Sequence, residues 1–85
     1  DIFAKTEVSV TNGQTINFNI QSAGKYTLIL FDTTTNQVVA KEKFNGIVGN
    51  NVKKIYTTTF NQKTLYLYLT DTLGNKISKT KLLIN

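Results

Sequence analysis

Hydrophobic and polar residues alternate with a period of two over short segments of this chain, and helical spacing is not seen. The segment Ile16–Ile20 reads Ile-Asn-Phe-Asn-Ile, and Leu65–Leu69 reads Leu-Tyr-Leu-Tyr-Leu. A period of two places successive side chains on opposite faces of a β-strand, so each segment has one face for a core. The pattern predicts an all-β protein.

Turn-forming residues separate these segments at intervals of roughly 8–12 residues, which is typical of a β-sandwich or barrel. Strand is followed by strand with no intervening helix, so a parallel sheet is not expected. We predict one domain over residues 1–85, folded as an antiparallel sandwich of about seven strands. The expected strands are Val8–Val10, Ile16–Ile20, Tyr26–Asp32, Gln37–Phe44, Val52–Phe60, Thr64–Thr70 and Lys76–Ile84.

The apolar positions of these strands define an expected core. The nearly continuous apolar segment Tyr26–Asp32 indicates a central strand, whereas the lysines of Gln37–Phe44 indicate an edge strand that resists aggregation. The predicted core residues are Val8, Val10, Ile16, Phe18, Ile20, Leu28, Leu30, Leu65, Leu67 and Leu69.

Two similar hairpins are expected, one after each of the most apolar strands, and Asp-Thr opens the turn in both. In the second, Asp71 takes the first position of a type I turn, and Gly74 supplies a positive φ. In the first, Asp32 and Asn36 take the corresponding roles, since asparagine tolerates the left-handed conformation. These four residues are therefore interpreted as structural.

Missing residue types exclude most chemistry. The chain has no Cys and no His, which removes disulfides, thiolate nucleophiles, and the most common general base and metal ligand. The net charge of +5 comes from lysine alone, because there is no arginine, and arginine is the residue preferred for sequence-specific readout of nucleic acid. We expect no enzyme activity, no cofactor, no metal and no specific nucleic-acid partner.

The strand Gly24–Asp32, the hairpin Asp71–Asn75 and the lysine-rich final strand together resemble immunoglobulin-like or fibronectin-III-like modules of bacterial surface or secreted proteins. The resemblance covers most of the chain, but antibody domains are excluded because their Trp and paired Cys are missing. It implies a non-catalytic accessory module, acting as a spacer or in adhesion or interaction, in a larger extracellular bacterial protein. The implied location is secreted or cell-surface, and the implied partners are other domains of the same polypeptide.

A second resemblance is to the C-terminal sorting domains of type IX secretion substrates. Those domains also run strand, Asp-x-x-Gly turn, strand, and Lys79–Ile84 fits their lysine-containing final segment loosely. The Asn-Pro segment expected early in such domains is absent, since the chain contains no Pro.

The aromatic side of Thr64–Thr70 is the main candidate binding site. If its leucines face the core, Tyr66 and Tyr68 point outward, and Ile29 and Phe31 widen that face. Exposed aromatic residues in a row can form a platform for sugar rings, so a carbohydrate-binding module is an alternative function. The competing interpretation is that another domain, or the stems of lysines, covers the rings.

Lysines cluster at Lys41–Lys43, Lys53–Lys54 and Lys76–Lys81. Such clusters suit contact with a polysaccharide or an acidic cell-wall polymer, although a solvated strand face is the ordinary explanation. No apolar run approaches the roughly 18 residues of a membrane span, so no membrane insertion is expected.

Three other kinds of site lack part of what they need. Asp32 and Asp71 could form a carboxylate pair, but they are expected at opposite ends of neighbouring antiparallel strands. Calcium binding would rest on Asp71, Thr72 and Asn75, which offer one carboxylate between them. An intramolecular isopeptide bond would need Lys5, Asn85 and an acid (Glu7 or Glu42) to meet in the core.

Overall fold

The chain folds as a two-layered β-sandwich. The computed structural model describes residues 2–3, 5–58, 60–61 and 63–85, and over these residues it contains seven strands and no helix. The all-β class predicted from the sequence is therefore confirmed. The strands are β1 (Glu7–Val10), β2 (Gln14–Ile20), β3 (Gly24–Asp32), β4 (Gln37–Gly46), β5 (Gly49–Ile55), β6 (Thr64–Thr70) and β7 (Lys76–Ile84).

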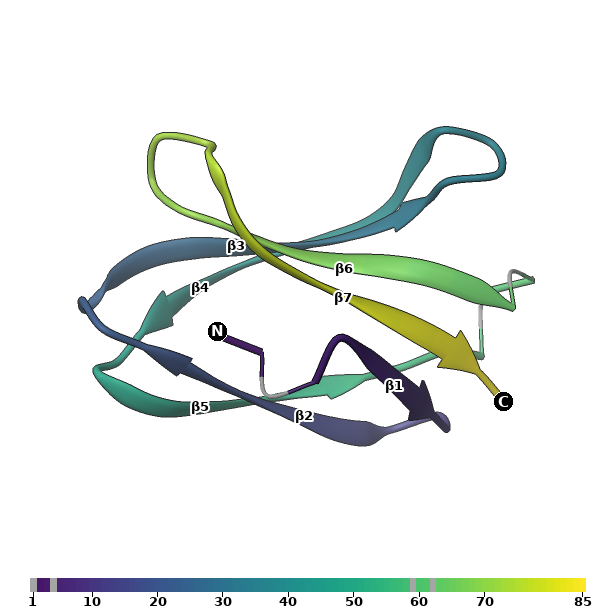
Figure 1. Ribbon diagram of the computed structural model, residues 1–85, viewed down its shortest axis with the longest axis horizontal. Coiled ribbons are helices and arrows are strands. Elements are labelled where there is room, and N and C mark those ends of the chain that lie inside the picture. The colour runs from purple at the N-terminus through teal and green to yellow at the C-terminus, as the bar shows by residue number, and fades with distance from the viewer. Residues whose placement is uncertain (1, 4, 59, 62) are drawn as a thin grey trace.

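The two layers differ in size. The large sheet has the strand order β1-β7-β6-β3-β4, and the small sheet consists of β2 and β5. Figure 1 shows the small sheet lying below the large one, with the β3–β4 and β6–β7 hairpins rising at opposite ends. As expected, β4 is an edge strand, and β3 is an interior strand with a neighbour on each side, although the middle strand of the sheet is β6.

The expectation of a purely antiparallel sheet is wrong at one edge. β1 pairs with β7 in parallel, with Val8 opposite Leu82 and Val10 opposite Ile84. A parallel pair needs a long crossover, and the usual sequence signal for one is a βαβ unit. Here the crossover is the rest of the domain, because β1 and β7 are the first and last strands.

The core lies between the layers and combines alternate residues of both sheets. All predicted core residues are buried except Val8, which is half-buried and packs against the core from the edge strand β1. Phe3, Ile55 and Leu82 are also buried although they were not predicted. Phe3 forms an isolated bridge with Phe18, and their ring centres lie 5.6 Å apart.

The strand expected at Val52–Phe60 is displaced toward the N-terminus. β5 covers Gly49–Ile55, because the amide of the buried Asn51 donates to the carbonyls of Ile47 and Gly49 and so shapes the preceding turn. Beyond Ile55, the N–H of Thr57 donates to Oδ1 of Asn12, which ends the pairing with β2. The high β-propensity of the threonines is overridden there by a tertiary contact; Thr59 lies outside the described residues.

β4 also extends beyond the predicted strand Gln37–Phe44, through Asn45 and Gly46. Gly46 pairs with Gly24 on β3, and a Cβ at Gly46 would lie 2.7 Å from the Tyr26 ring. Glycine therefore marks a close approach within a strand here, and not a turn.

Both Asp-Thr hairpins have well-defined turn geometry. Oδ1 of Asp32 accepts the N–H of Thr34 at 2.9 Å, and Asn36 has a φ of 60°. In the second hairpin, Oδ1 of Asp71 accepts the N–H groups of Leu73 and Asn75, both at 2.9 Å, and the φ of Gly74 is 82°. The hydrogen bond from the backbone of Asn75, together with that from Leu73, lowers the pKa of Asp71 from its ordinary value.

Candidate binding face

The outward surface of the large sheet carries a row of apolar and aromatic side chains on β3 and β6. The leucines of β6 face the core, so Tyr66 and Tyr68 face outward, and the pairing of β6 with β3 places them opposite Phe31 and Ile29. All four side chains are half-buried. Ile29, Phe31, Tyr66 and Tyr68 are called the aromatic row below.

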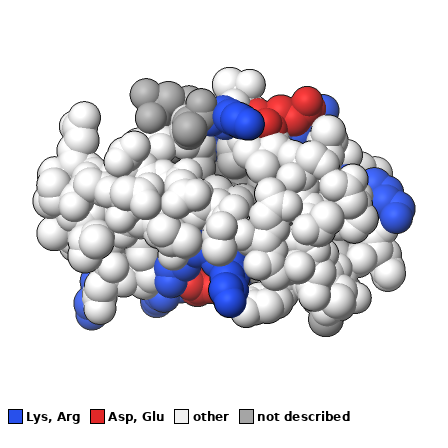
Figure 2. Space-filling view, turned by 90° about the horizontal axis from the view of Figure 1, so that it is seen from below, with Lys and Arg blue, Asp and Glu red and all other residues white. Residues whose placement is uncertain are grey.

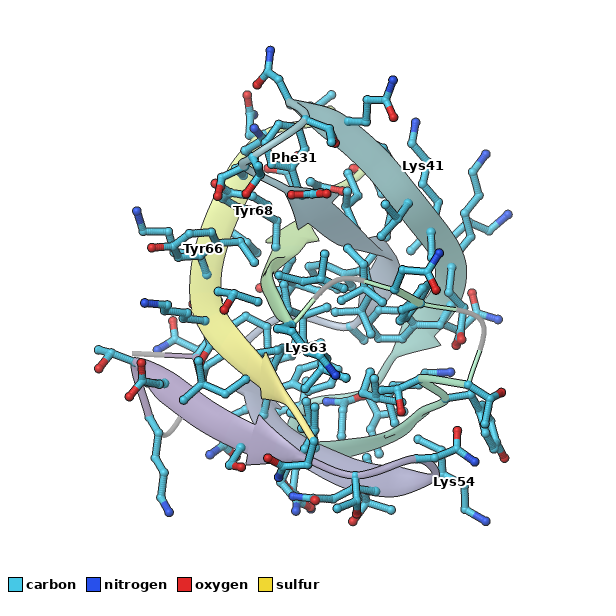
Figure 3. All side chains as sticks on the ribbon, turned by 90° about the vertical axis from the view of Figure 1, so that its right-hand side faces the viewer. Phe31, Lys41, Lys54, Lys63, Tyr66 and Tyr68 are labelled. Atoms are coloured by element: carbon cyan, nitrogen blue, oxygen red, sulfur yellow. The ribbon has the colours of Figure 1, made fainter. Side chains whose placement is uncertain are left out.

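The Tyr68 ring lies between those of Phe31 and Tyr66 and contacts both, but the three rings do not lie in one plane. The ring centres of Phe31 and Tyr68 lie 6.2 Å apart at an interplanar angle of 74°, and those of Tyr66 and Tyr68 lie 6.2 Å apart at 32°. Figure 3 shows the three side chains following one another along one outer side of the large sheet. The row is therefore corrugated, and differs from the flat platform that would suit a flat crystalline surface.

Lysines of β7 cover these rings. The ammonium of Lys76 lies 4.4 Å from the centre of the Tyr68 ring and 5.7 Å from that of Phe31. The ammonium of Lys79 lies 5.5 Å from the centre of the Tyr66 ring. These are cation–π contacts, which hold an ammonium over the negative face of a ring. The structure thus places lysine over the rings, as the competing interpretation of the sequence expected.

Further lysines flank the aromatic row on its other side. Lys41 and Lys43 of β4 pair with Ile29 and Thr27, so they share the outward face of the sheet. Lys81 of β7 lies on the same face, since it is opposite Tyr66. We call Lys41 and Lys43 the β4 lysines, and Lys76, Lys79 and Lys81 the β7 lysines.

The surface continues beyond the aromatic row toward the Asp71 turn. A depression of about 400 Å³ is lined there by Lys25, Thr27 and Lys43, among others, with Asp71 at its edge. Lys25 faces outward in register with Asn45, so another cation joins the same face. The outer face of the large sheet thus combines an aromatic centre with cations on both sides and at one end.

The small sheet presents a different surface. Its outward positions pair Thr15 with Lys54, Asn17 with Val52 and Asn19 with Asn50, so most are uncharged. Figure 2, which looks onto this side from below, shows a mostly uncharged surface with the charged groups at its margins.

The sequence cluster Lys53–Lys54 is separated by the fold. Lys53 forms an ion pair with Glu42 at 2.7 Å and lies 5.0 Å from the centre of the Phe44 ring, so it ties β5 to β4. Lys54 points outward from the small sheet (Figure 3). The Lys53 ammonium is therefore paired with a carboxylate, whereas the Lys54 ammonium faces solvent.

The other sites considered from the sequence do not assemble. The β3–β6 register puts Phe31 opposite Tyr66 and Thr27 opposite Thr70, so Asp32 and Asp71 follow opposite ends of the strand pair. The Asp71 carboxylate accepts hydrogen bonds from its own turn, and the described residues hold no group of three or more acidic, His or Cys residues suited to a metal.

The residues of the hypothetical isopeptide bond do not meet in the core either. Lys5 and Asn85 are both exposed, and the Asn85 amide donates to Oγ of Ser9. Glu42 lies on β4, at the opposite edge of the large sheet from β1, and forms its ion pair with Lys53 of β5.

Comparison of this chain with protein-family models, curated proteins and solved structures found no match. Among the described residues, no helix has the length and apolarity needed to cross a membrane.

Proposed function

We propose that this chain is a non-catalytic, immunoglobulin-like accessory module of a larger extracellular bacterial protein, and that it acts through the outer face of its large sheet. The observation that carries the proposal is the aromatic row on β3 and β6 with lysines on both sides. Solvent-facing aromatic residues gathered on one sheet are typical of interaction sites.

The strand order supports the immunoglobulin-like part of the proposal. In that fold, strands B and E share one sheet, and strands C, F and G share the other, with C′ added beside C in variable-type domains. In this chain, the small sheet of β2 and β5 would correspond to strands B and E. In the large sheet, β3, β6 and β7 would correspond to C, F and G, and β4 to C′. The extracellular and bacterial parts rest on the resemblance of the sequence to modules of surface proteins.

The non-catalytic part is supported by the residues themselves. His and Cys are absent, and of the five acidic residues those of the two hairpin turns lie at opposite ends of the large sheet, too far apart to act as a catalytic pair. The outer face offers lysines and tyrosines, which are suited to binding; its described acids are Glu7, which pairs with Lys81, and Asp71, whose carboxylate accepts hydrogen bonds from its own turn.

The test is a binding screen of the isolated domain against insoluble and soluble extracellular polymers. We expect binding to at least one polymer, and we expect Tyr66→Ala/Tyr68→Ala to weaken it at least tenfold. Tyr56→Ala is the matched control, because Tyr56 is 62% exposed and lies outside the large sheet. Equal weakening by both variants, or no binding to any polymer, would refute a role for this face.

A secretion sorting domain is the second candidate. The Asp71 turn with Gly74 and the outward lysines of β7 support it, because these are the features that resemble type IX sorting domains. Fusion of the chain to the C-terminus of a reporter protein in a bacterium with that secretion system tests it. Surface display of the reporter would favour sorting, and retention in the periplasm would refute it.

A further inference from the structure

We propose that the outer face of the large sheet binds an anionic polysaccharide, with the β4 and β7 lysines contacting its negative groups and the aromatic row contacting the sugars between them. This inference rests on the proposed function, because it names the ligand class of the same face.

The outer face of the large sheet carries far more positive than negative charge. Six of the ten lysines face outward on the large sheet, whereas the acidic residues on this side are, among the residues that the structure describes, Glu7 and Asp71. The six are Lys25, Lys41, Lys43, Lys76, Lys79 and Lys81. A surface with cations and few acids attracts a polyanion.

Most of these cations have no carboxylate partner among the residues that the structure describes. Lys81 lies 3.8 Å from Glu7, and the other five have no described acidic neighbour within ion-pair distance: Lys25, Lys41, Lys43, Lys76 and Lys79. Their charge is therefore available to a ligand.

Two of the ammoniums are held in place before any ligand arrives. Lys76 is positioned over Tyr68 and Phe31, and Lys79 over Tyr66. Holding a flexible lysine over a ring reduces the conformational entropy that binding would otherwise cost. The rings thus contribute by positioning cations as well as by direct contact.

The spacing of the lysines suits an extended chain running along the strands. Two strands, β6 and β3, separate β7 from β4, which puts the two sets of lysine backbones about 14 Å apart. Lys79 and Lys81, like Lys41 and Lys43, follow one another at about 7 Å along their strands. A sugar chain lying over the aromatic row would have cations on both sides, repeating along its length.

The ring surface favours sugars over nucleobases. Base stacking needs open, parallel ring faces, whereas the Phe31 and Tyr68 rings are tilted by 74° and an ammonium caps Tyr68 and Tyr66. Tyrosine hydroxyls and ammoniums are instead hydrogen-bonding groups, which a chain rich in hydroxyls can engage along its whole length. An acidic polypeptide would offer carboxylates but not the row of hydroxyl groups that could engage the tyrosine hydroxyls and ammoniums along the face.

The experiment is an NMR titration of the isotope-labelled domain at low ionic strength with oligogalacturonate, which carries carboxylates, and with a sulfated heparin oligosaccharide. A neutral xylan oligosaccharide, poly-L-glutamate and oligo-dT are run in parallel. We expect saturable shifts at Tyr66, Tyr68, Lys76 and Lys79 with at least one anionic sugar. Its affinity should exceed that of the other three probes at least tenfold and fall as salt is added.

The variants Lys76→Gln/Lys79→Gln and Lys54→Gln/Lys63→Gln remove the same charge from different places. Lys54 lies on the small sheet, and Lys63 is exposed in the segment between β5 and β6. We expect the first variant to weaken binding of the anionic sugar at least tenfold, and the second to change it less than threefold. Equal weakening would mean that net charge alone matters, and would overturn the inference.

The remaining outcomes separate the inference from the proposed function. Tight binding of neutral xylan at the same residues would overturn the anionic ligand and leave the proposed binding function standing. Equal or tighter binding of poly-L-glutamate or oligo-dT would overturn the polysaccharide. Absence of shifts on the outer face with every probe would count against both.

Discussion

The Lys76 ammonium lies 4.4 Å from the centre of the Tyr68 ring and also reaches toward Phe31. This contact joins β7 to the two central strands of the large sheet on their outward side. Because of this contact, the aromatic surface carries an ammonium group whose position is set by the rings beneath it.

In the free domain, the ring current of Tyr68 should shift the ε-methylene protons of Lys76 upfield. Tyr68→Leu should remove most of this shift, and Lys76→Gln should reduce stability by about 0.5–1 kcal/mol, the size of an exposed cation–π contact. Two-dimensional NMR and urea denaturation are the measurements. Lys76 protons at random-coil positions in the unchanged protein would contradict the contact.

Core packing between the sheets should depend strongly on β6. Leu67 is 1% exposed, so Leu67→Ala should reduce the free energy of unfolding by about 2–5 kcal/mol. Leu73→Ala is the matched control; Leu73 is 83% exposed, and the change should cost less than about 0.5 kcal/mol. Urea denaturation followed by circular dichroism measures both, and similar losses in the two variants would contradict the assigned core.

The two paired glycines of β3 and β4 should respond differently to a methyl group. Gly46→Ala would place Cβ 2.7 Å from the Tyr26 ring, so we expect a loss of about 1–3 kcal/mol from overpacking. Gly24→Ala meets no atom within 4 Å and should be nearly neutral. Thermal unfolding of both variants checks this. If Gly24→Ala proved the more damaging, the register of β3 and β4 would be wrong.

The Asp71 turn should make stability depend on pH. Hydrogen bonds from Asn75 and Leu73 lower the pKa of Asp71 in the folded state, so the carboxylate stabilises the fold above its ordinary pKa of about 3.9. This contribution is lost as the pH falls through the lower folded-state pKa. Asp71→Asn keeps an acceptor oxygen without the charge, so its urea midpoint should fall less than that of the parent protein between about pH 5 and pH 2. Parallel curves for the two proteins would contradict a role for the ionised carboxylate.

The period-two pattern was sufficient for the all-β class, for the positions of the strands and for most of the core. The Leu-Tyr-Leu-Tyr-Leu segment shows why: alternation assigns each side chain to a face regardless of which strands are neighbours. The end of the chain is less clear, since Leu82, Leu83 and Ile84 are all apolar. Only the pairing with β6 shows that Leu82 is the fully buried one.

Strand limits were harder to predict where side chains act at a distance along the chain. Asn51 resembles a turn residue in the sequence, yet it is buried within β5 and shapes the turn before it. Thr57 resembles a strand residue, yet it lies outside the strands, and its N–H donates a hydrogen bond to Oδ1 of Asn12. Local propensity describes neither residue, because both are governed by hydrogen bonds with other parts of the chain.

The sequence by itself determined which residues face inward, where the two Asp-Thr hairpins turn, and that the chain lacks the residue types of common catalysis. Only the tertiary structure decided that β1 runs parallel to β7 and that Lys53 forms an ion pair while the adjacent Lys54 faces solvent. It also decided that Lys76 and Lys79 lie over Tyr68 and Tyr66. The physical reason is that alternation is a property of one strand, whereas the order and register of strands depend on contacts between segments far apart in the chain.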